Sequence, residues 1–242
     1  TRRVITPLAV DKKQPTQVLT DAQSQYRSYQ PLILPDENLV GTPRQLKAGT
    51  LYAGAEEPCI RLREALGSDV RYEVYFTIRD YCDFIPSMYC EYLRHNSFCT
   101  FDKYVESSGY HKLNWVNLYR ILVDVFGTDQ VVFFNFETFS KYEALLMNKL
   151  LPQGQMYKRY RIDDRPSIAR ASFCESAIKL FELGSDLLDE QGLKKLVELV
   201  EAGALDDNWS TDQKYRPLNN DSLLKERYTQ HVQTLEELGN FM

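Results

Sequence analysis

An arginine and a serine spaced eight residues apart are the first candidates for chemistry in this sequence. The apolar, β-type run Val74–Ile78 ends at Arg79, and Ser87 follows among helix-forming and aromatic residues. An arginine at the end of a strand offers fixed, permanently charged donors, and the start of the next helix offers free backbone N–H groups and a positive dipole end. Together these groups are suited to binding a phosphate. The competing interpretation is a surface ion pair between Arg79 and Asp80 or Asp83.

The helix that carries Ser87 has two possible starts. Asp83 is a good N-cap candidate, because Pro86 then falls in the first turn, where its missing N–H costs nothing. A start at Asp80 would instead place Pro86 inside the helix, where it would kink it. We expect the start at Asp83, with Ser87 close to the amino end of the helix, where an anion is favoured.

The rest of the chain alternates between strand-like and helix-like patterns. We expect strands at 31–35, 72–78 and 131–136, and helices at 55–66, 101–107, 114–126, 140–151, 167–183, 185–202 and 221–238, with a polar linker over 206–220. Strands that alternate with helices predict an α/β domain with a parallel sheet.

Charged residues follow each of the three predicted strands. They are Asp36 with Glu37, then Arg79, then Glu137. Ligands of parallel sheets bind beyond the carboxyl ends of the strands, so we expect these residues to converge at one edge. For Glu137 we expect a structural role, accepting backbone N–H bonds at the next turn.

Length and composition indicate one soluble globular domain. The 242 residues are 43% apolar and 26% charged, with a net charge of −5. We expect a single domain over 1–242, with an irregular segment at 1–30, an α/β core at 31–152 and a mostly helical part at 153–242. The acidic balance argues against a nucleic-acid partner. No apolar run has the length of a membrane span, and no signal peptide is recognised.

Cysteine and histidine are scattered along the chain. They are Cys59, Cys82, Cys90, Cys99, Cys174, His95, His111 and His231. No CxxC pair and no ligand cluster indicates a metal site. An odd number of cysteines, two of them in the apolar 74–94 segment, predicts reduced thiols and a cytoplasmic location.

Several segments together resemble the sulfotransferases that use 3′-phosphoadenylyl sulfate (PAPS). The segment FTIRDYCDFIPSMYCEYLR is similar to the family's second nucleotide motif, in which a strand ends in Arg and a Ser follows eight positions later. The resemblance implies that Arg79 and Ser87 bind the 3′-phosphate. The segments LNWVNLYRILVDVFGTDQVVFFNFETF and RIDDRPSIARASF also resemble family segments in the expected order. The similarity covers roughly residues 31–183.

The resemblance implies a P-loop-like three-layer domain and an enzyme that moves a sulfuryl group from PAPS to a hydroxyl or amine of a glycan or small-molecule acceptor. PAP is then the product, and no metal is required. Glu37 is the candidate catalytic base, with Asp36 as the runner-up; otherwise Asp36 caps the next turn and Glu37 faces solvent. Arg165 and Ser167 are candidates for further nucleotide contacts, although Pro166 could simply begin a helix there.

One family motif has no counterpart in this chain. The family's first motif, GxxKxGTT, holds the 5′-phosphosulfate, and the segment GTPRQLKAGT at 41–50 lacks the order that it requires. We expect that motif in residues upstream of Thr1. The alternatives are a non-catalytic nucleotide- or glycan-binding protein on the same fold and, third, a nucleotide kinase.

The helix that carries Ser87 continues toward the expected acceptor cleft with Tyr89, Tyr92, Arg94 and His95. Exposed aromatic and arginine side chains would suit a glycan. The competing interpretation, which we prefer for the two tyrosines, is that Tyr89 and Tyr92 are core aromatics at helical spacing.

Overall fold

The structure is a computed structural model that describes residues 39–49, 51–68, 70–139, 141, 143, 144, 148, 172–202, 214–239 and 241. The predicted strand at 31–35 and most of the predicted helix at 140–151 lie outside these residues. The described elements are α2 (Pro43–Lys47), α3 (Glu56–Leu66), β1 (Val74–Ile78), α4 (Tyr81–His95), α5 (Phe101–Ser108), η1 (Tyr110–Lys112), α6 (Trp115–Phe126), η2 (Thr128–Gln130), β2 (Val131–Asn135), η3 (Phe136–Thr138), α8 (Glu175–Leu187), α9 (Glu190–Glu201) and α10 (Ser222–Glu237).

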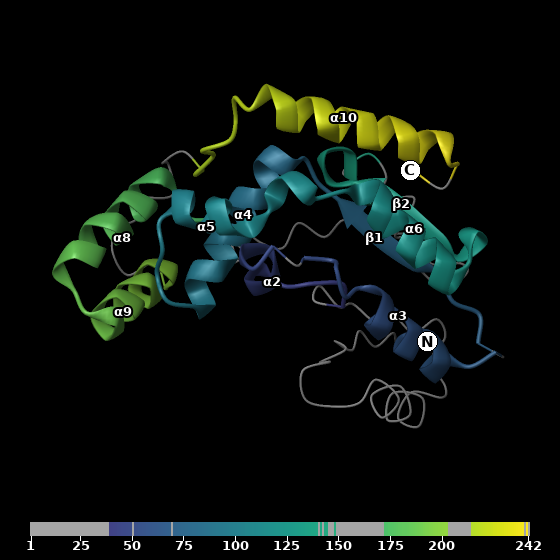
Figure 1. The fold of residues 1–242 in the computed structure, drawn as a ribbon, viewed down its shortest axis with the longest axis horizontal. Coiled ribbons are helices and arrows are strands. Elements are labelled where there is room, and N and C mark those ends of the chain that lie inside the picture. Colours follow the sequence, from purple (N-terminus) through teal and green to yellow (C-terminus); the bar gives the residue numbers. More distant parts are fainter. Residues whose placement is uncertain are drawn as a thin grey trace.

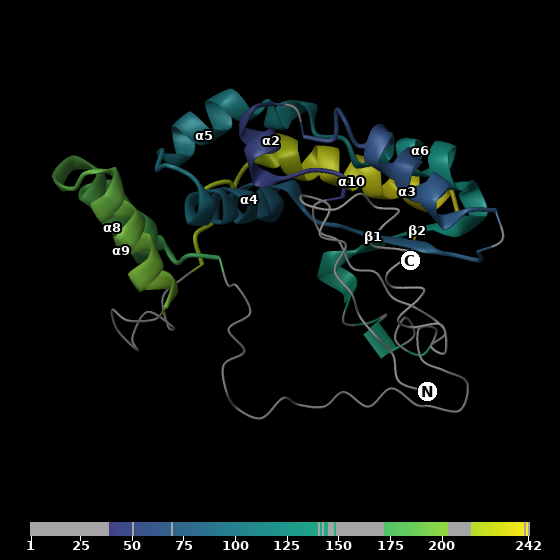
Figure 2. The ribbon, with the colours of Figure 1, turned by 90° about the horizontal axis from the view of Figure 1, so that it is seen from below.

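The two described strands form a parallel sheet, which confirms the α/β character expected from the sequence. β1 and β2 pair in register from Val74 opposite Val131 to Ile78 opposite Asn135. Helices α4, α5 and α6 make the crossover between them. Figure 2 shows α3, α6 and α10 on one side of the sheet. A three-layer, P-loop-like arrangement stays a prediction.

Helix α6 covers the sheet as its apolar stripe predicts. The side chain of Asn114 caps its start by accepting from the backbone N–H of Asn117 at 3.0 Å. Gly127 ends it with a φ of 92°, a conformation that other residues rarely adopt. Tyr119 of α6 packs its ring 5.3 Å from that of Phe133 in β2. The helix therefore rests directly on the inner face of the sheet.

An aromatic cluster around Trp115 joins α6 to α4. The ring of Trp115 is 1% exposed and stacks on Tyr81 at 5.3 Å, with an angle of 12° between the ring planes. Phe84 meets the same indole edge-on at 5.1 Å, and Tyr52 lies 5.7 Å away. The backbone N–H of Trp115 also donates to the hydroxyl of Tyr81 at 3.1 Å. This cluster holds the amino end of α4 against the amino end of α6.

The C-terminal helix α10 closes the other side of this cluster (Figure 1). Nδ1 of His231 lies 2.8 Å from the hydroxyl of Tyr81. That hydroxyl also accepts from the N–H of Trp115, so it links α6 to α10. Burial and the nearby charge of Arg227 lower the pKa of His231, which keeps Nδ1 available as an acceptor.

The two helices α8 and α9 form a hairpin that lies at the far end of α4 from the sheet (Figures 1 and 2). The predicted boundary between the helices at 167–183 and 185–202 is wrong. α8 continues to Leu187, and Asp189 caps α9 by accepting from the N–H of Gly192 at 2.8 Å. A Cβ at Gly184 would lie 3.0 Å from the side chain of Leu196. This glycine therefore permits close packing of the two helices.

Helix α3 forms as predicted and buries one face. Ile60 is 39% exposed, whereas Cys59 and Leu62 are buried.

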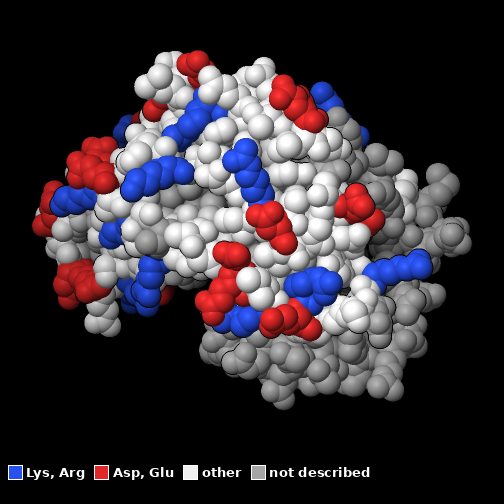
Figure 3. All heavy atoms as spheres, turned by 45° about the vertical axis from the view of Figure 1, so that its right-hand side comes forward, with Lys and Arg blue, Asp and Glu red and all other residues white. Residues whose placement is uncertain are grey.

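Figure 3 shows Lys and Arg interspersed with Asp and Glu over the face it displays, so the net charge of −5 is not gathered there in one acidic patch. No helix in the described part of the chain combines the length and apolarity needed to cross a membrane.

Candidate functional site

The turn after β1 is fixed from two directions. Ile78, the last residue of β1, is fully buried, and the indole N–H of Trp115 donates to the carbonyl of Arg79 at 3.1 Å. The backbone N–H of Asp80 donates to Oε1 of Glu137 at 2.9 Å. The side chain of Arg79 therefore starts from a backbone that both the aromatic cluster and the neighbouring strand end hold in place.

Three cations surround a single carboxylate beside this turn. Oδ1 of Asp83 lies 3.3 Å from Nε of Arg216 and 3.7 Å from Nζ of Lys214, and Oδ2 lies 4.0 Å from Nη2 of Arg79. One carboxylate neutralises one of these charges. Among the ion-paired groups at this position, positive charges therefore outnumber negative ones three to one, in a chain whose net charge is negative. The carboxylates of Asp80 and Glu137 lie at the same turn, where each accepts from a backbone N–H group. Such a cluster of cations favours binding of a phosphate or another compact anion.

Three further features describe the surroundings of these cations. Burial, followed by repulsion from Arg79, lowers the pKa of Lys214. The guanidinium of Arg79 lies 4.9 Å from the centre of the Phe136 ring, which is 52% exposed. Nε of Arg79 is buried and has no hydrogen-bond partner in the described part of the structure. Arg79 is thus held by Phe136 and contacts Asp83 only at the outer limit of an ion pair.

The predicted start of α4 at Asp83 is wrong. The helix begins at Tyr81, and Asp80 caps it by accepting from the N–H of Cys82 at 2.7 Å. Pro86 consequently sits at the sixth helical position, which removes a backbone hydrogen bond at a cost of about 3 kcal/mol. Burial of Tyr81 and Pro86 in the core offsets this cost. Tertiary packing, and not local propensity, decides where α4 begins.

The start of α4 at Tyr81 changes the role expected of Ser87. As the seventh residue of α4, Ser87 does not lie at a helix amino end, so neither free N–H groups nor the dipole end can contribute to anion binding there. Ser87 is half-buried and follows Asp83 by one helical turn, on the same face. Ser87 therefore lies on the face of α4 where Asp83 contacts the three cations.

Glu137 joins the ends of the two strands. Its Oε1 accepts from the N–H of Asp80, and its Oε2 accepts from the hydroxyl of Tyr228 in α10 at 2.8 Å. The expected structural role is therefore confirmed, but its backbone partner lies after β1 and not in the next turn. Burial and this hydrogen bond raise the pKa of Tyr228.

The carboxyl end of α4 carries both core residues and cavity residues. Tyr89 and Tyr92 are 0% and 6% exposed, which confirms the interpretation of both as core aromatics. Arg94 is held by Glu91 at 2.8 Å and by Glu201 at 3.1 Å. Tyr92, Arg94 and His95 also line a cavity of about 600 Å³.

Four of the predicted site residues lie outside the described residues. They are Asp36, Glu37, Arg165 and Ser167. Two cations of the candidate site, Lys214 and Arg216, were not predicted, because we interpreted 206–220 as a polar linker. The available signal was their spacing, since alternate residues of an extended segment point the same way.

None of the five cysteines, all of which the structure describes, forms a disulfide. Cys59, Cys82 and Cys90 are buried, and Cys99 and Cys174 are half-buried. Burial raises the pKa of Cys59 and of Cys90 to about 11, so both thiols stay protonated near neutral pH. Among the described residues, no group of three or more His, Cys, Asp or Glu side chains could hold a metal ion.

We expect Asp83→Asn to destabilise the protein and to strengthen anion binding. The change leaves Arg79, Lys214 and Arg216 without their shared carboxylate, which should lower the free energy of unfolding by about 1 kcal/mol. Added phosphate should raise the unfolding temperature of this variant more than that of the native chain. Thermal unfolding with and without phosphate measures both effects. Asp124→Asn, at an exposed position of α6, is the matched control; an equal response to phosphate in the two variants would contradict the assignment.

Comparisons with known proteins found nothing that assigns the chain: no family model matches it, and the searches of curated proteins and of solved structures returned no significant match. The residues of this site are therefore the basis for the proposed function.

Proposed function

We propose that this chain is a PAPS-dependent sulfotransferase in which Arg79, Ser87, Lys214 and Arg216 bind the 3′-phosphate of the nucleotide. The observation that supports the proposal is the set of three cations around Asp83 at the carboxyl end of a parallel strand. Ligands of α/β proteins bind at such strand ends. The spacing between Arg79 and Ser87, which resembles the family's nucleotide motif, supports the same nucleotide.

The proposed reaction transfers a sulfuryl group in line. The bond between sulfur and the bridging oxygen of PAPS breaks, a bond from sulfur to an acceptor oxygen or nitrogen forms, and PAP leaves. A base takes the acceptor proton. Catalysis of this kind is positioning together with stabilisation of charge. We propose Glu37 as the base, Arg165 and Ser167 as further nucleotide contacts, and a glycan or small molecule as the acceptor.

In this scheme Arg79 orients the nucleotide. Its backbone is fixed by Trp115 and Glu137, and its guanidinium is held on the Phe136 ring. A cation that is already in place loses little conformational entropy when it binds a phosphate. Arg79 lies near Oδ2 of Asp83, whereas Lys214 and Arg216 lie near Oδ1. A phosphate that displaces this carboxylate would therefore be contacted by all three cations.

A second function has a specific observation in its favour. The chain contains no GxxKxGT sequence that could hold the 5′-phosphosulfate. A non-catalytic protein that binds the nucleotide only through its 3′-phosphate would need the cations around Asp83 and no such loop. Sulfuryl transfer from PAPS to an acceptor distinguishes the two, because only the enzyme produces PAP.

The proposal predicts recognition of the 3′-phosphate. PAP should bind at least about tenfold more tightly than adenosine 5′-monophosphate (AMP), which lacks that group, because each charge-assisted hydrogen bond contributes about 1.5–3 kcal/mol. Isothermal titration calorimetry with both nucleotides measures the difference. Equal affinities would show that the cations around Asp83 do not bind the 3′-phosphate.

A further inference from the structure

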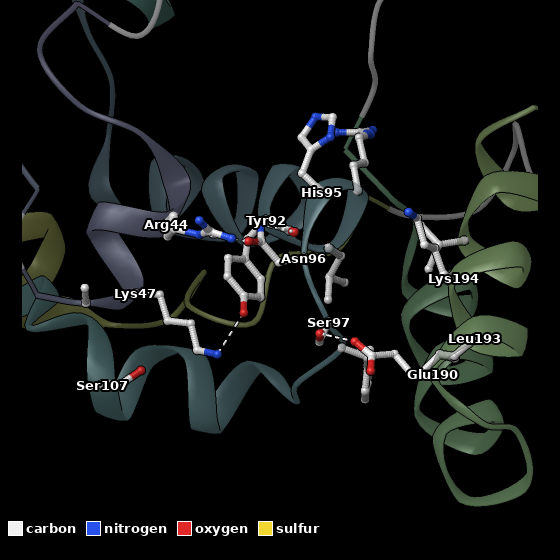
Figure 4. A pocket seen from close by; sticks show the side chains of 15 residues that line it. Arg44, Lys47, Tyr92, His95, Asn96, Ser97, Ser107, Glu190, Leu193 and Lys194 are labelled. Carbon is white, nitrogen blue, oxygen red and sulfur yellow. Dashed lines mark hydrogen bonds between the residues drawn. The ribbon is translucent and has the colours of Figure 1, made fainter. Parts of the chain in front are cut away.

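The second concentration of positive charge lies at the opposite end of α4. A cavity of about 600 Å³ opens between α2, the carboxyl end of α4 and the first half of α9 (Figure 4). Asp83 and His95 are twelve positions apart along α4, which corresponds to about 18 Å at 1.5 Å per residue. The cavity is therefore separate from the cations around Asp83.

Cations from two helices face each other across this cavity. Figure 4 shows Arg44 and Lys47 on one side, from α2, and Lys194 on the other side, from α9. Among the described residues, no carboxylate pairs with Arg44 or Lys194. The one carboxylate in the lining, Glu190, accepts a hydrogen bond from the hydroxyl of Ser97. The cavity is thus cationic in a chain whose net charge is −5.

The cations on the α2 side are held in position by their neighbours. Nε of Arg44 donates to Oδ1 of Asn96 at 3.2 Å, while Nδ2 of Asn96 donates to the carbonyl of Tyr92 at 2.9 Å. This contact uses only one edge of the Arg44 guanidinium, whose planar fork matches a carboxylate. Nζ of Lys47 donates to the hydroxyl of Tyr92 at 2.8 Å, and this bond raises the pKa of Lys47. Both side chains therefore keep their charge and their orientation.

The rest of the lining combines apolar residues with Arg94, His95 and Ser107. Leu93, Leu193 and Val197 are buried at the cavity wall, and Phe98 also contributes to it. A volume of this size accommodates a small organic ligand. An apolar wall with cations on two opposite sides suits an elongated molecule that has apolar ring faces and at least two separated negative groups. A single phosphate would contact only one side.

We propose that this cavity binds an acidic oligosaccharide that carries at least two uronate carboxylates, one contacted by Arg44 and Lys47 and the other by Lys194. The sugar rings would lie against the apolar wall between these cations. This site does not depend on the nucleotide site or on sulfuryl transfer.

The test is calorimetric titration of the full chain with tetragalacturonate and, as a neutral saccharide, with maltotetraose. We expect binding of tetragalacturonate only, and at least about tenfold weaker binding to Lys194→Gln, which loses one charge-assisted contact. Lys195→Gln is the matched control, because it removes the next lysine of α9, which is exposed and outside the cavity lining. Thermal unfolding of both variants confirms that each is folded.

Four results would overturn the proposal. They are no binding of tetragalacturonate, equal binding of maltotetraose, an equal loss in Lys194→Gln and Lys195→Gln, and tighter binding of inositol hexaphosphate with the same dependence on Lys194. Titration of Lys194→Gln with PAP separates the two sites. We expect unchanged PAP affinity in this variant, and a tenfold loss would contradict the independence of the cavity from the nucleotide site.

Discussion

Trp115→Ala is expected to lower the free energy of unfolding by about 3–5 kcal/mol, as found for large-to-small changes at buried aromatic positions. The indole is 1% exposed and contacts the rings of Tyr81 and Phe84. Its removal opens a cavity at the junction of α4 and α6 and leaves the carbonyl of Arg79 without its donor. Urea unfolding followed by circular dichroism measures the loss.

Trp115→Phe separates the two contributions. Phenylalanine keeps most of the ring contact with Tyr81 but cannot donate to the carbonyl of Arg79. We expect a smaller loss of about 1–3 kcal/mol, which corresponds to one unsatisfied buried polar group and the lost ring volume. A loss below about 1 kcal/mol for Trp115→Ala would show that this cluster does not hold the turn after β1.

Arg79→Ala is expected to weaken PAP binding by at least about tenfold, since it removes a charged donor from the proposed phosphate site. Arg79→Lys should bind with intermediate affinity, because an ammonium keeps the charge but loses the planar fork. Isothermal titration calorimetry measures all three affinities. The matched control is Arg61→Ala, because Arg61 forms only an exposed ion pair with Glu57 on α3.

Arg79→Ala should leave stability nearly unchanged, which keeps the binding result interpretable. Within the described residues Arg79 has one long ion pair, at 4.0 Å, and its removal reduces repulsion with Lys214. PAP affinity equal to that of the native chain would contradict the assignment of Arg79. A similar loss in Arg61→Ala would indicate an effect of net charge and not of the site.

The spacing of apolar residues predicted those strands and helices whose formation depends on residues close together in the sequence. The strands at 74–78 and 131–135 and the helices α3, α5, α6 and α10 follow the apolar spacing of the sequence closely. A parallel pairing of β1 and β2 followed from the helices between them. The strands and helices themselves depend on residues that are neighbours in the sequence, so the sequence alone is informative about them.

The errors concern positions where packing outweighs local propensity. Asp80 and Asp83 are both good caps, and burial of Tyr81 decides between them. Glycine is common at helix ends, but Gly184 lies inside α8, where it permits close packing against α9. Lys214 and Arg216 reach Asp83 across more than a hundred residues of chain, which no local pattern encodes. The candidate site was therefore predicted only in part, through Arg79 and Ser87.

The most direct measurement is the ratio of the AMP and PAP dissociation constants, determined for the native chain and for Arg79→Ala. The ratio isolates the 3′-phosphate, because the two nucleotides share every other group. If the cations around Asp83 bind this phosphate, the ratio should be at least about ten in the native chain and should fall in the variant by the same factor by which Arg79→Ala weakens PAP binding. A ratio that is unchanged by Arg79→Ala would contradict the proposed nucleotide site.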